Sequence, residues 1–160
     1  MTDTQLGIGT AQFGGGYGIV ENSIVPSINQ AKNIINEAID RGANFFDTAA
    51  DYGNAEEVLG HCLPEKCAVR IVTKLPALPN DCLNVQNFVF ESLQQSKKKL
   101  NGRTPDLLLI HQPGDAIGKN ADALINTMLK IKSEGQIGGI GISLYDSNEI
   151  STFQHLEKID

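Results

Sequence analysis

The sequence predicts an α/β fold with parallel strands, because short apolar runs alternate with longer segments of helical period along its 160 residues. The five runs expected to form strands occupy residues 6–13, 44–47, 68–74, 107–111 and 137–143. A segment with helical spacing follows each run, so the helices would serve as right-handed crossovers between neighbouring strands. This length suits one domain, residues 1–160, with a hydrophobic core of its own.

The first helix has clear start and stop signals. Ser27 is a favourable N-cap, and Gln30 three residues later completes a capping box. Gly42 stands where a left-handed C-cap is expected. One face of this helix is apolar and consists of Ala31, Ile34, Ile35, Ala38 and Ile39.

The later helices show the same kinds of signal. Asn54 and Glu57 predict a capped helix over about 55–63, and Asp146 with Glu149 predicts a last helix that runs to the C-terminus. The two helices between them have buried faces formed by Val85, Val89, Leu93, Ser96 and Leu100, and by Leu124, Ile125, Met128 and Leu129.

Two architectures fit five alternating strand and helix units. One is a doubly wound open sheet of the flavodoxin type, and the other is a TIM (β/α)8-type barrel, of which this chain would hold about the first five βα units. The Gly7-x-Gly9 pair does not distinguish them, because Gln12 stands where a dinucleotide-binding fingerprint needs its third glycine. The pattern by itself leaves both architectures open.

Composition narrows the class of partner. A net charge of -6 without a dominant basic face argues against nucleic-acid binding. No apolar stretch approaches the roughly 20 residues that a membrane-spanning helix needs, and the first residues lack a signal-peptide pattern. Cys62, Cys67 and Cys82 show no metal-ligand spacing, and their odd count favours reduced thiols. We therefore expect a cytoplasmic protein with no metal site, no membrane partner and no nucleic-acid partner.

Four titratable residues gather where the expected strands end. Asp47, Lys74 and His111 each stand at the end of an apolar run, and Tyr52 follows Asp47 by five residues. In both architectures the carboxyl ends of parallel strands carry the functional site. The four side chains should therefore emerge on the same side of the sheet.

These residue types suit the protonation of a carbonyl oxygen during reduction. A free tyrosine has a pKa near 10 and is an inefficient acid at neutral pH. The ammonium group of Lys74 would lower the pKa of Tyr52, and Asp47 would keep Lys74 charged and oriented. His111 would donate a hydrogen bond to the carbonyl oxygen. The hydride must come from a cofactor, because no side chain can supply one.

The stretches around these residues resemble the aldo-keto reductase family, in family order and over nearly the whole chain. The most specific is the Asp-Thr-Ala-x-x-Tyr-Gly segment from Asp47 to Gly53. The other matching stretches lie at residues 6–14, 42–49, 56–60, 72–74, 106–111, 135–137 and 141–143. The resemblance implies the barrel rather than the open sheet.

The resemblance also implies a role for each residue of the cluster. Tyr52 matches the family's general acid, and Lys74 matches the residue that lowers the pKa of that acid. Asp47 matches the carboxylate paired with the lysine, and His111 matches the histidine that positions the substrate carbonyl.

Cofactor contacts follow from the same resemblance. Gly9, Thr10 and Asp47 lie where the family approaches the nicotinamide, and Ser143 matches a serine that holds its carboxamide. Leu144 follows this serine, where many relatives have asparagine. The expected cofactor is NADP(H), with NAD(H) as the alternative.

The length of the chain is the main departure from the family pattern. Family members continue through three more strands and helices, which supply most of the residues that hold the cofactor. We therefore expect a partial barrel, truncated at its C-terminal side, whose first and fifth strands have unpaired edges. Such edges predict self-association.

Three functions are compatible with the sequence. The first is an oxidoreductase that reduces a small aldehyde or ketone to an alcohol with NAD(P)H and uses Tyr52 as proton donor. The second is a catalytically inactive, truncated reductase chain that acts as an interaction or structural module. The third is a flavodoxin-like nucleotide or flavin binder with a phosphate loop at residues 14–18. The substrate itself is not encoded in a recognisable motif.

Overall fold

The computed structural model describes residues 6–15, 24–153 and 158–160, and its centre is one five-stranded parallel sheet. Each strand pairs with the next one in the sequence, so the order is β1-β2-β3-β4-β5. The strands are β1 (Gly7–Gly9), β2 (Phe45–Asp47), β3 (Arg70–Leu75), β4 (Leu107–Ile110) and β5 (Gly139–Ile142).

This strand order decides between the two architectures. A doubly wound sheet reverses its strand order at a switch point, whereas a barrel adds each strand beside the previous one. The register is parallel throughout, with Gly9 opposite Asp47 and Lys74 opposite Leu109. The predicted partial (β/α)8-type barrel is therefore confirmed, and the flavodoxin-like alternative is wrong.

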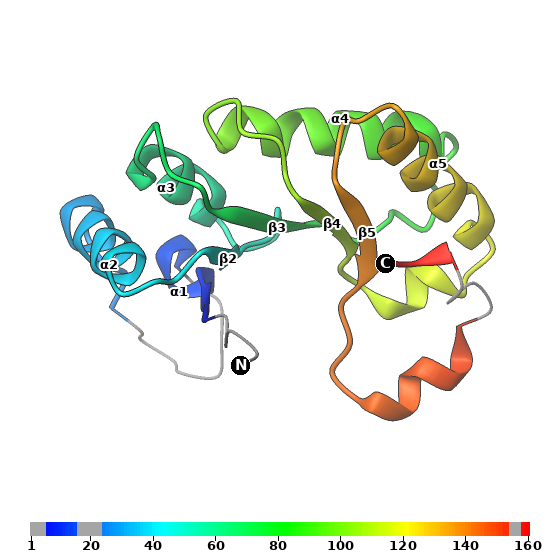
Figure 1. Cartoon of the computed structure of the whole chain (residues 1–160). Coiled ribbons are helices and arrows are strands. Elements are labelled where there is room, and N and C mark those ends of the chain that lie inside the picture. The colour runs from blue at the N-terminus through cyan, green and yellow to red at the C-terminus, as the bar shows by residue number, and fades with distance from the viewer. Residues whose placement is uncertain (1–5, 16–23, 154–157) are drawn as a thin grey trace, which may run out of the picture.

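The helices follow each other along one side of the sheet. Figure 1 shows α2, α3, α4 and α5 in an outer row along the sheet. A short helix, α1, and two 3-10 segments, η1 and η2, complete the described elements. Their bounds are α1 (Ala11–Gly14), α2 (Ile28–Asp40), α3 (Ala55–Cys62), α4 (Val85–Lys99), η1 (Pro113–Ala116), α5 (Ala121–Ser133) and η2 (Ser147–Thr152). Within the described part of the chain, no helix has the length and apolar character required to cross a bilayer.

The hydrophobic core lies between the sheet and these outer helices, in two clusters. One joins β3, β4 and β5 to α4 and α5, and its fully buried members include Val89, Leu93, Leu108 and Ile131. The other joins β2 and β3 to α2 and α3, and its fully buried members include Ile35, Phe46, Leu59 and Leu100. Both clusters hold the strands rigidly, so that the strand ends can position polar side chains.

Three local predictions from the sequence are wrong in detail. The first apolar run does not continue as a strand to residue 13, because the strand ends at Gly9 and residues 11–14 form α1. The last segment is the short 3-10 helix η2, after which Phe153 is extended, so no helix runs on from Asp146 to the C-terminus. Ile34 is 46% exposed although it shares a face with buried Ile35.

Asn54 also differs from its predicted role as a helix cap. Its side chain makes no capping hydrogen bond to α3. With its amide oriented to satisfy its neighbours, Asn54 donates to the carbonyl oxygens of Phe13 and Gly14, both at 3.2 Å. The side chain therefore joins α1 to the start of α3, a tertiary role that local spacing does not reveal.

The predicted capping box at the start of α2 is confirmed. The Ser27 hydroxyl accepts a hydrogen bond from the Gln30 amide at 3.4 Å, and the Ser27 amide donates to Gln30 Oε1 at 2.9 Å. We expect Ser27→Ala to lower the free energy of unfolding by about 1 kcal/mol, the usual cost of a lost N-cap. Urea denaturation followed by circular dichroism measures this change. Ser27→Asp retains an acceptor and serves as the control, and an equal loss in both variants would contradict the capping explanation.

Part of the β5 edge is paired within the chain. The Ile140 amide donates to Asp160 Oδ2 at 2.9 Å, and the Asp160 amide donates to the Ile140 carbonyl at 3.2 Å. Lys132 donates a hydrogen bond to the same carboxylate. The hydrogen bond from Lys132 has the largest effect in holding the pKa of Asp160 below its ordinary value, and the hydrogen bond from Ile140 has the next largest. Asp160 thus occupies hydrogen-bonding positions on the edge that was expected to be unpaired.

Candidate functional site

The four residues of the predicted site come together at the carboxyl ends of β2, β3 and β4. Asp47 is the last residue of β2, Lys74 lies one residue before the end of β3, and His111 directly follows β4. Tyr52 lies in the loop between β2 and α3. The parallel register places Asp47 opposite Val72, two residues before Lys74, and Lys74 opposite Leu109, two residues before His111.

Lys74 is the centre of the cluster. Only 4% of its surface is exposed, and its Nζ donates to Asp47 Oδ1 at 2.6 Å and to the Thr48 carbonyl at 2.9 Å. A buried ammonium group needs such partners, because removing a charge from water is costly. The same Nζ lies 4.9 Å from the centre of the Tyr52 ring. The charge of Lys74 is therefore held between a carboxylate and an aromatic side chain.

Tyr52 and His111 are in edge-to-face contact. Their ring centres are 5.5 Å apart and the rings are inclined at 82°. Tyr52 is 8% exposed and His111 is 5% exposed, so water has little access to the contact. The Tyr52 ring thus lies within 4.9 Å of the Lys74 ammonium group and in edge contact with the His111 imidazole.

The backbone of Tyr52 is held by a close approach of α1. A Cβ atom added to Gly14 would lie 1.6 Å from the Tyr52 carbonyl oxygen, so only glycine fits at this position. Gly53 has a φ of +58°, and a Cβ there would lie 2.4 Å from the Gly14 carbonyl oxygen. Two glycines therefore allow α1 to rest against the loop that carries the tyrosine. The rest of the predicted phosphate loop, residues 16–18, lies outside the described residues.

The predicted nicotinamide contacts lie around the same strand ends. Space is open beside Gly9, since a Cβ built there meets no atom within 4 Å. Thr10 is fully buried and uses its amide and its hydroxyl to bind the Asp47 carbonyl, at 2.9 and 3.0 Å. Ser143 is half-buried, and its amide donates to the Ile110 carbonyl at 2.9 Å. Open space beside Gly9 therefore adjoins the Asp47 side chain, which is 36% exposed, at the carboxyl ends of β1 and β2.

Sequence reasoning missed two acidic residues near this site. Asp51 Oδ2 lies 3.4 Å from Nδ1 of His111. Glu56 is fully buried, accepts a hydrogen bond from the Thr73 hydroxyl at 2.6 Å and lies 3.7 Å from Lys99 Nζ. Glu56 lies in the stretch 56–60 that resembles the family, but local spacing predicts only a helix there. Asp51 had no signal, because only the fold brings it to His111.

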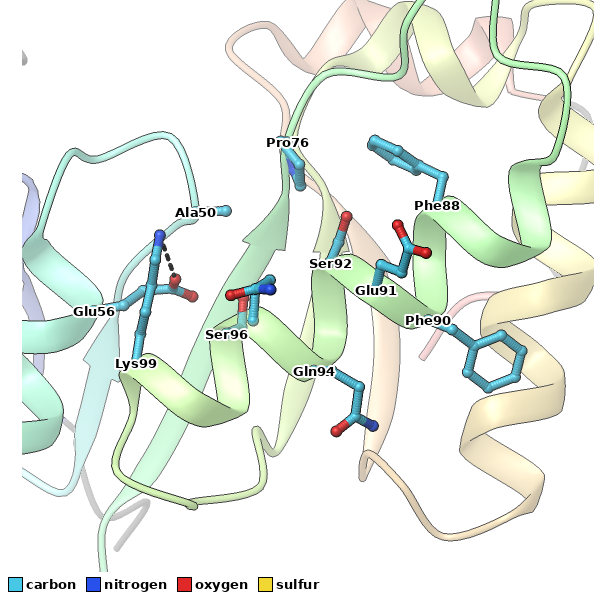
Figure 2. Close-up of a pocket in the computed structure, with 11 residues that line it drawn as sticks. Ala50, Glu56, Pro76, Phe88, Phe90, Glu91, Ser92, Gln94, Ser96 and Lys99 are labelled. Carbon is cyan, nitrogen blue, oxygen red and sulfur yellow. Dashed lines mark ion pairs between the residues drawn. The ribbon is translucent and has the colours of Figure 1, made fainter.

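A groove of about 550 Å³ runs between α3 and α4. Figure 2 shows the Glu56 and Lys99 side chains facing each other at one end and Phe88 and Pro76 near the other. None of the four predicted site residues lines this groove. It lies on the helix side of the sheet and is separate from the tyrosine cluster.

Comparisons with known proteins agree with the fold. The profile of the Aldo/keto reductase family matches residues 5–160, and the chain belongs to this family. One curated relative, the 6-dehydroglucose reductase of Novosphingobium aromaticivorans, is 28% identical in an alignment of 156 positions that covers 88% of this chain and 49% of that protein.

Solved structures give the same result for the fold. An aldo-keto reductase from Bacillus halodurans in its holo form superposes with a TM-score of 0.73 at 23% identity, over 98% of this chain and 50% of that one. The glycerol dehydrogenase of Gluconobacter oxydans gives 0.67 at 25% identity, over 94% of this chain and 47% of that one. The chain therefore spans about half the length of the relatives it matches.

Proposed function

We propose that this chain carries the proton-transfer site of an oxidoreductase that reduces an aldehyde or ketone to an alcohol with NAD(P)H. The observation that carries the proposal is the buried Lys74 ammonium group, which contacts the Asp47 carboxylate at 2.6 Å and lies 4.9 Å from the Tyr52 ring centre. Membership of the aldo-keto reductase family supports it. The substrate is a small carbonyl compound, and the location is the cytoplasm.

In this proposal Tyr52 is the proton donor. Its hydroxyl transfers a proton to the carbonyl oxygen, while the ammonium group of Lys74 stabilises the phenolate that is left behind. Asp47 and the Thr48 carbonyl keep Lys74 oriented through two of its three N–H donors. His111 donates a hydrogen bond to the carbonyl oxygen and orients the substrate.

The nicotinamide, when bound, supplies the hydride that the carbonyl carbon receives. Gly9, Thr10, Asp47 and Ser143 are the residues proposed to hold its ring and carboxamide. NADP(H) is the proposed cofactor and NAD(H) the alternative. Burial of Tyr52 and His111 keeps bulk water away from the reacting oxygen, so that the proton comes from the tyrosine.

The second candidate is a chain without catalytic activity that acts as an interaction or structural module. The observation in its favour is that this chain spans 49% of the length of that curated reductase relative. Self-association through the edges of the sheet would be its expected property.

The rate of NADPH oxidation at 340 nm with a panel of aldehydes and ketones tests the choice between them. We expect a carbonyl-dependent loss of absorbance with one alcohol formed for each NADPH consumed. Two control reactions give the background rate. One contains the purified chain and NADPH without a carbonyl compound, and the other contains the chain and a carbonyl compound without NADPH. A folded chain that neither binds NADPH nor consumes it would favour the second candidate.

A further inference from the structure

One ring nitrogen of His111 faces a carboxylate that the proposed mechanism does not use. Nδ1 of His111 is buried and makes no hydrogen bond among the described residues. The group beside it is the Asp51 carboxylate, with Oδ2 at 3.4 Å. Asp51 is 39% exposed at its side chain, and no other ion pair or hydrogen bond holds it within the described part of the chain.

The contact between His111 Nδ1 and Asp51 Oδ2 is attractive or repulsive according to the protonation state of the ring. A neutral imidazole with its proton on Nε2 leaves the electron-rich Nδ1 3.4 Å from the carboxylate, an electrostatic repulsion beside a buried acceptor without a donor. A proton on Nδ1 converts this repulsion into attraction. The geometry therefore favours the states of His111 that carry a proton on Nδ1.

The other charged groups of this corner are already matched. Asp47 and Lys74 form their own ion pair. Tyr52 contacts the His111 ring edge-on, and η1 contributes Asp115, whose carboxylate accepts a hydrogen bond from the Leu78 amide. The neighbouring strand β5 has the sequence Gly-Ile-Gly-Ile and brings no titratable side chain. Among the described residues, His111 is thus the group within reach of Asp51 that becomes a cation when protonated.

We propose that Asp51 is a positioning residue, which keeps a proton on Nδ1 of His111. The part that concerns the substrate rests on the proposed function. A carbonyl oxygen needs a donor at Nε2, and a ring that donates from both nitrogens is an imidazolium. His111 therefore offers the carbonyl oxygen a charge-assisted hydrogen bond, which is stronger than a neutral one and strengthens further as the oxygen becomes an alkoxide. The ring keeps both protons throughout, and Tyr52 supplies the proton that is transferred.

Nitrogen-15 NMR of the imidazole rings tests the first part without any turnover. The full chain, labelled at its three histidines, is compared with Asp51→Asn at the same pH, and His111→Gln assigns the signals of His111. We expect Nδ1 of His111 to be protonated in the unsubstituted chain. In Asp51→Asn the amide is nearly isosteric and donates to Nδ1, so Nδ1 should lose its proton and Nε2 should keep one. The exposed His61 should be unchanged in both chains.

Asp81→Asn is the matched control, because it removes a carboxylate from an exposed turn. An unprotonated Nδ1 of His111 in the unsubstituted chain would overturn the proposal. So would a protonation state of His111 in Asp51→Asn that equals the state in the unsubstituted chain. Asp51→Ala repeats the comparison if the asparagine variant does not fold. This readout is independent of activity, so an inactive chain would count against the proposed function and not against the role of Asp51.

Kinetics test the part that concerns the substrate. Replacement of a charged donor by a neutral one should lower kcat/KM for the carbonyl about tenfold in Asp51→Asn, since charge-assisted hydrogen bonds are roughly twice as strong as neutral ones. The KM for NADPH should not change. An unchanged kcat/KM for the carbonyl would show that the imidazolium does not assist the reduction.

Discussion

Tyr52→Phe should lower kcat for carbonyl reduction by at least about a hundredfold, because general acid catalysis contributes on the order of 10²–10⁴ to such reactions. The substitution removes one hydroxyl group and retains the ring. The edge-to-face contact with His111 and the position over Lys74 should therefore persist. The affinity for NADPH should stay the same, since the phenol hydroxyl is proposed to act on the substrate and not on the cofactor.

Steady-state kinetics and NADPH titration by intrinsic or nucleotide fluorescence measure the two quantities separately. Tyr145→Phe is the matched control, because it removes the same hydroxyl group from a tyrosine that is 82% exposed. It should leave kcat within about twofold, as expected for a surface substitution. Equal activity in Tyr52→Phe and the unsubstituted chain would show that the proton comes from another group.

Lys74→Met should slow reduction by about tenfold or more and should also change its dependence on pH. An ammonium group within about 4–6 Å lowers the pKa of an acid by about 1–3 units. Its removal should raise the apparent pKa of the proton donor, which makes the donor a weaker acid at neutral pH. A proton donor must be protonated to act, so activity is lost as pH rises through its pKa. In Lys74→Met this alkaline loss should therefore move to higher pH.

The shift of the alkaline loss is measured from the pH dependence of kcat/KM between about pH 6 and 10, which reaches the ordinary pKa of tyrosine. Lys130→Met provides the control, since Lys130 lies on the outer surface of α5 and pairs only loosely with Glu134, at 4.0 Å. Lys74→Arg keeps the charge and should keep the alkaline loss closer to its original pH. A pH profile that is the same in Lys74→Met and in the unsubstituted chain would exclude Lys74 as the group that tunes the acid.

Much of the fold could be predicted because its signals are local. The capping box of Ser27 and Gln30 and the left-handed Gly42 depend on neighbours within one turn of chain, and both are present in the structure. The buried spacing of Val89 and Leu93 likewise follows from helical period. The order of the strands could not be obtained in this way, because alternating units are compatible with two sheet topologies.

The errors arose where tertiary contacts override local preference. Asn54 resembles a helix cap in sequence, but its amide binds carbonyl groups of α1 that come from 40 residues earlier. Residues 11–14 continue an apolar run, yet they turn into a helix because Gly14 must rest against the Tyr52 backbone. In both cases a contact with a distant segment decides the local structure, which local spacing does not describe.

The sequence by itself determined which chemical groups stand at the strand ends. Asp47, Lys74 and His111 follow apolar runs, and parallel strands bring such positions to one edge whatever the details of packing. Only the tertiary structure decided how these groups meet. The 2.6 Å contact of Lys74 with Asp47 and the approach of Asp51 to His111 depend on strand register and on the path of the loop between β2 and α3. Hydrogen bonds and ion pairs act over a few ångströms, so only the folded arrangement of distant segments determines which groups come within their reach.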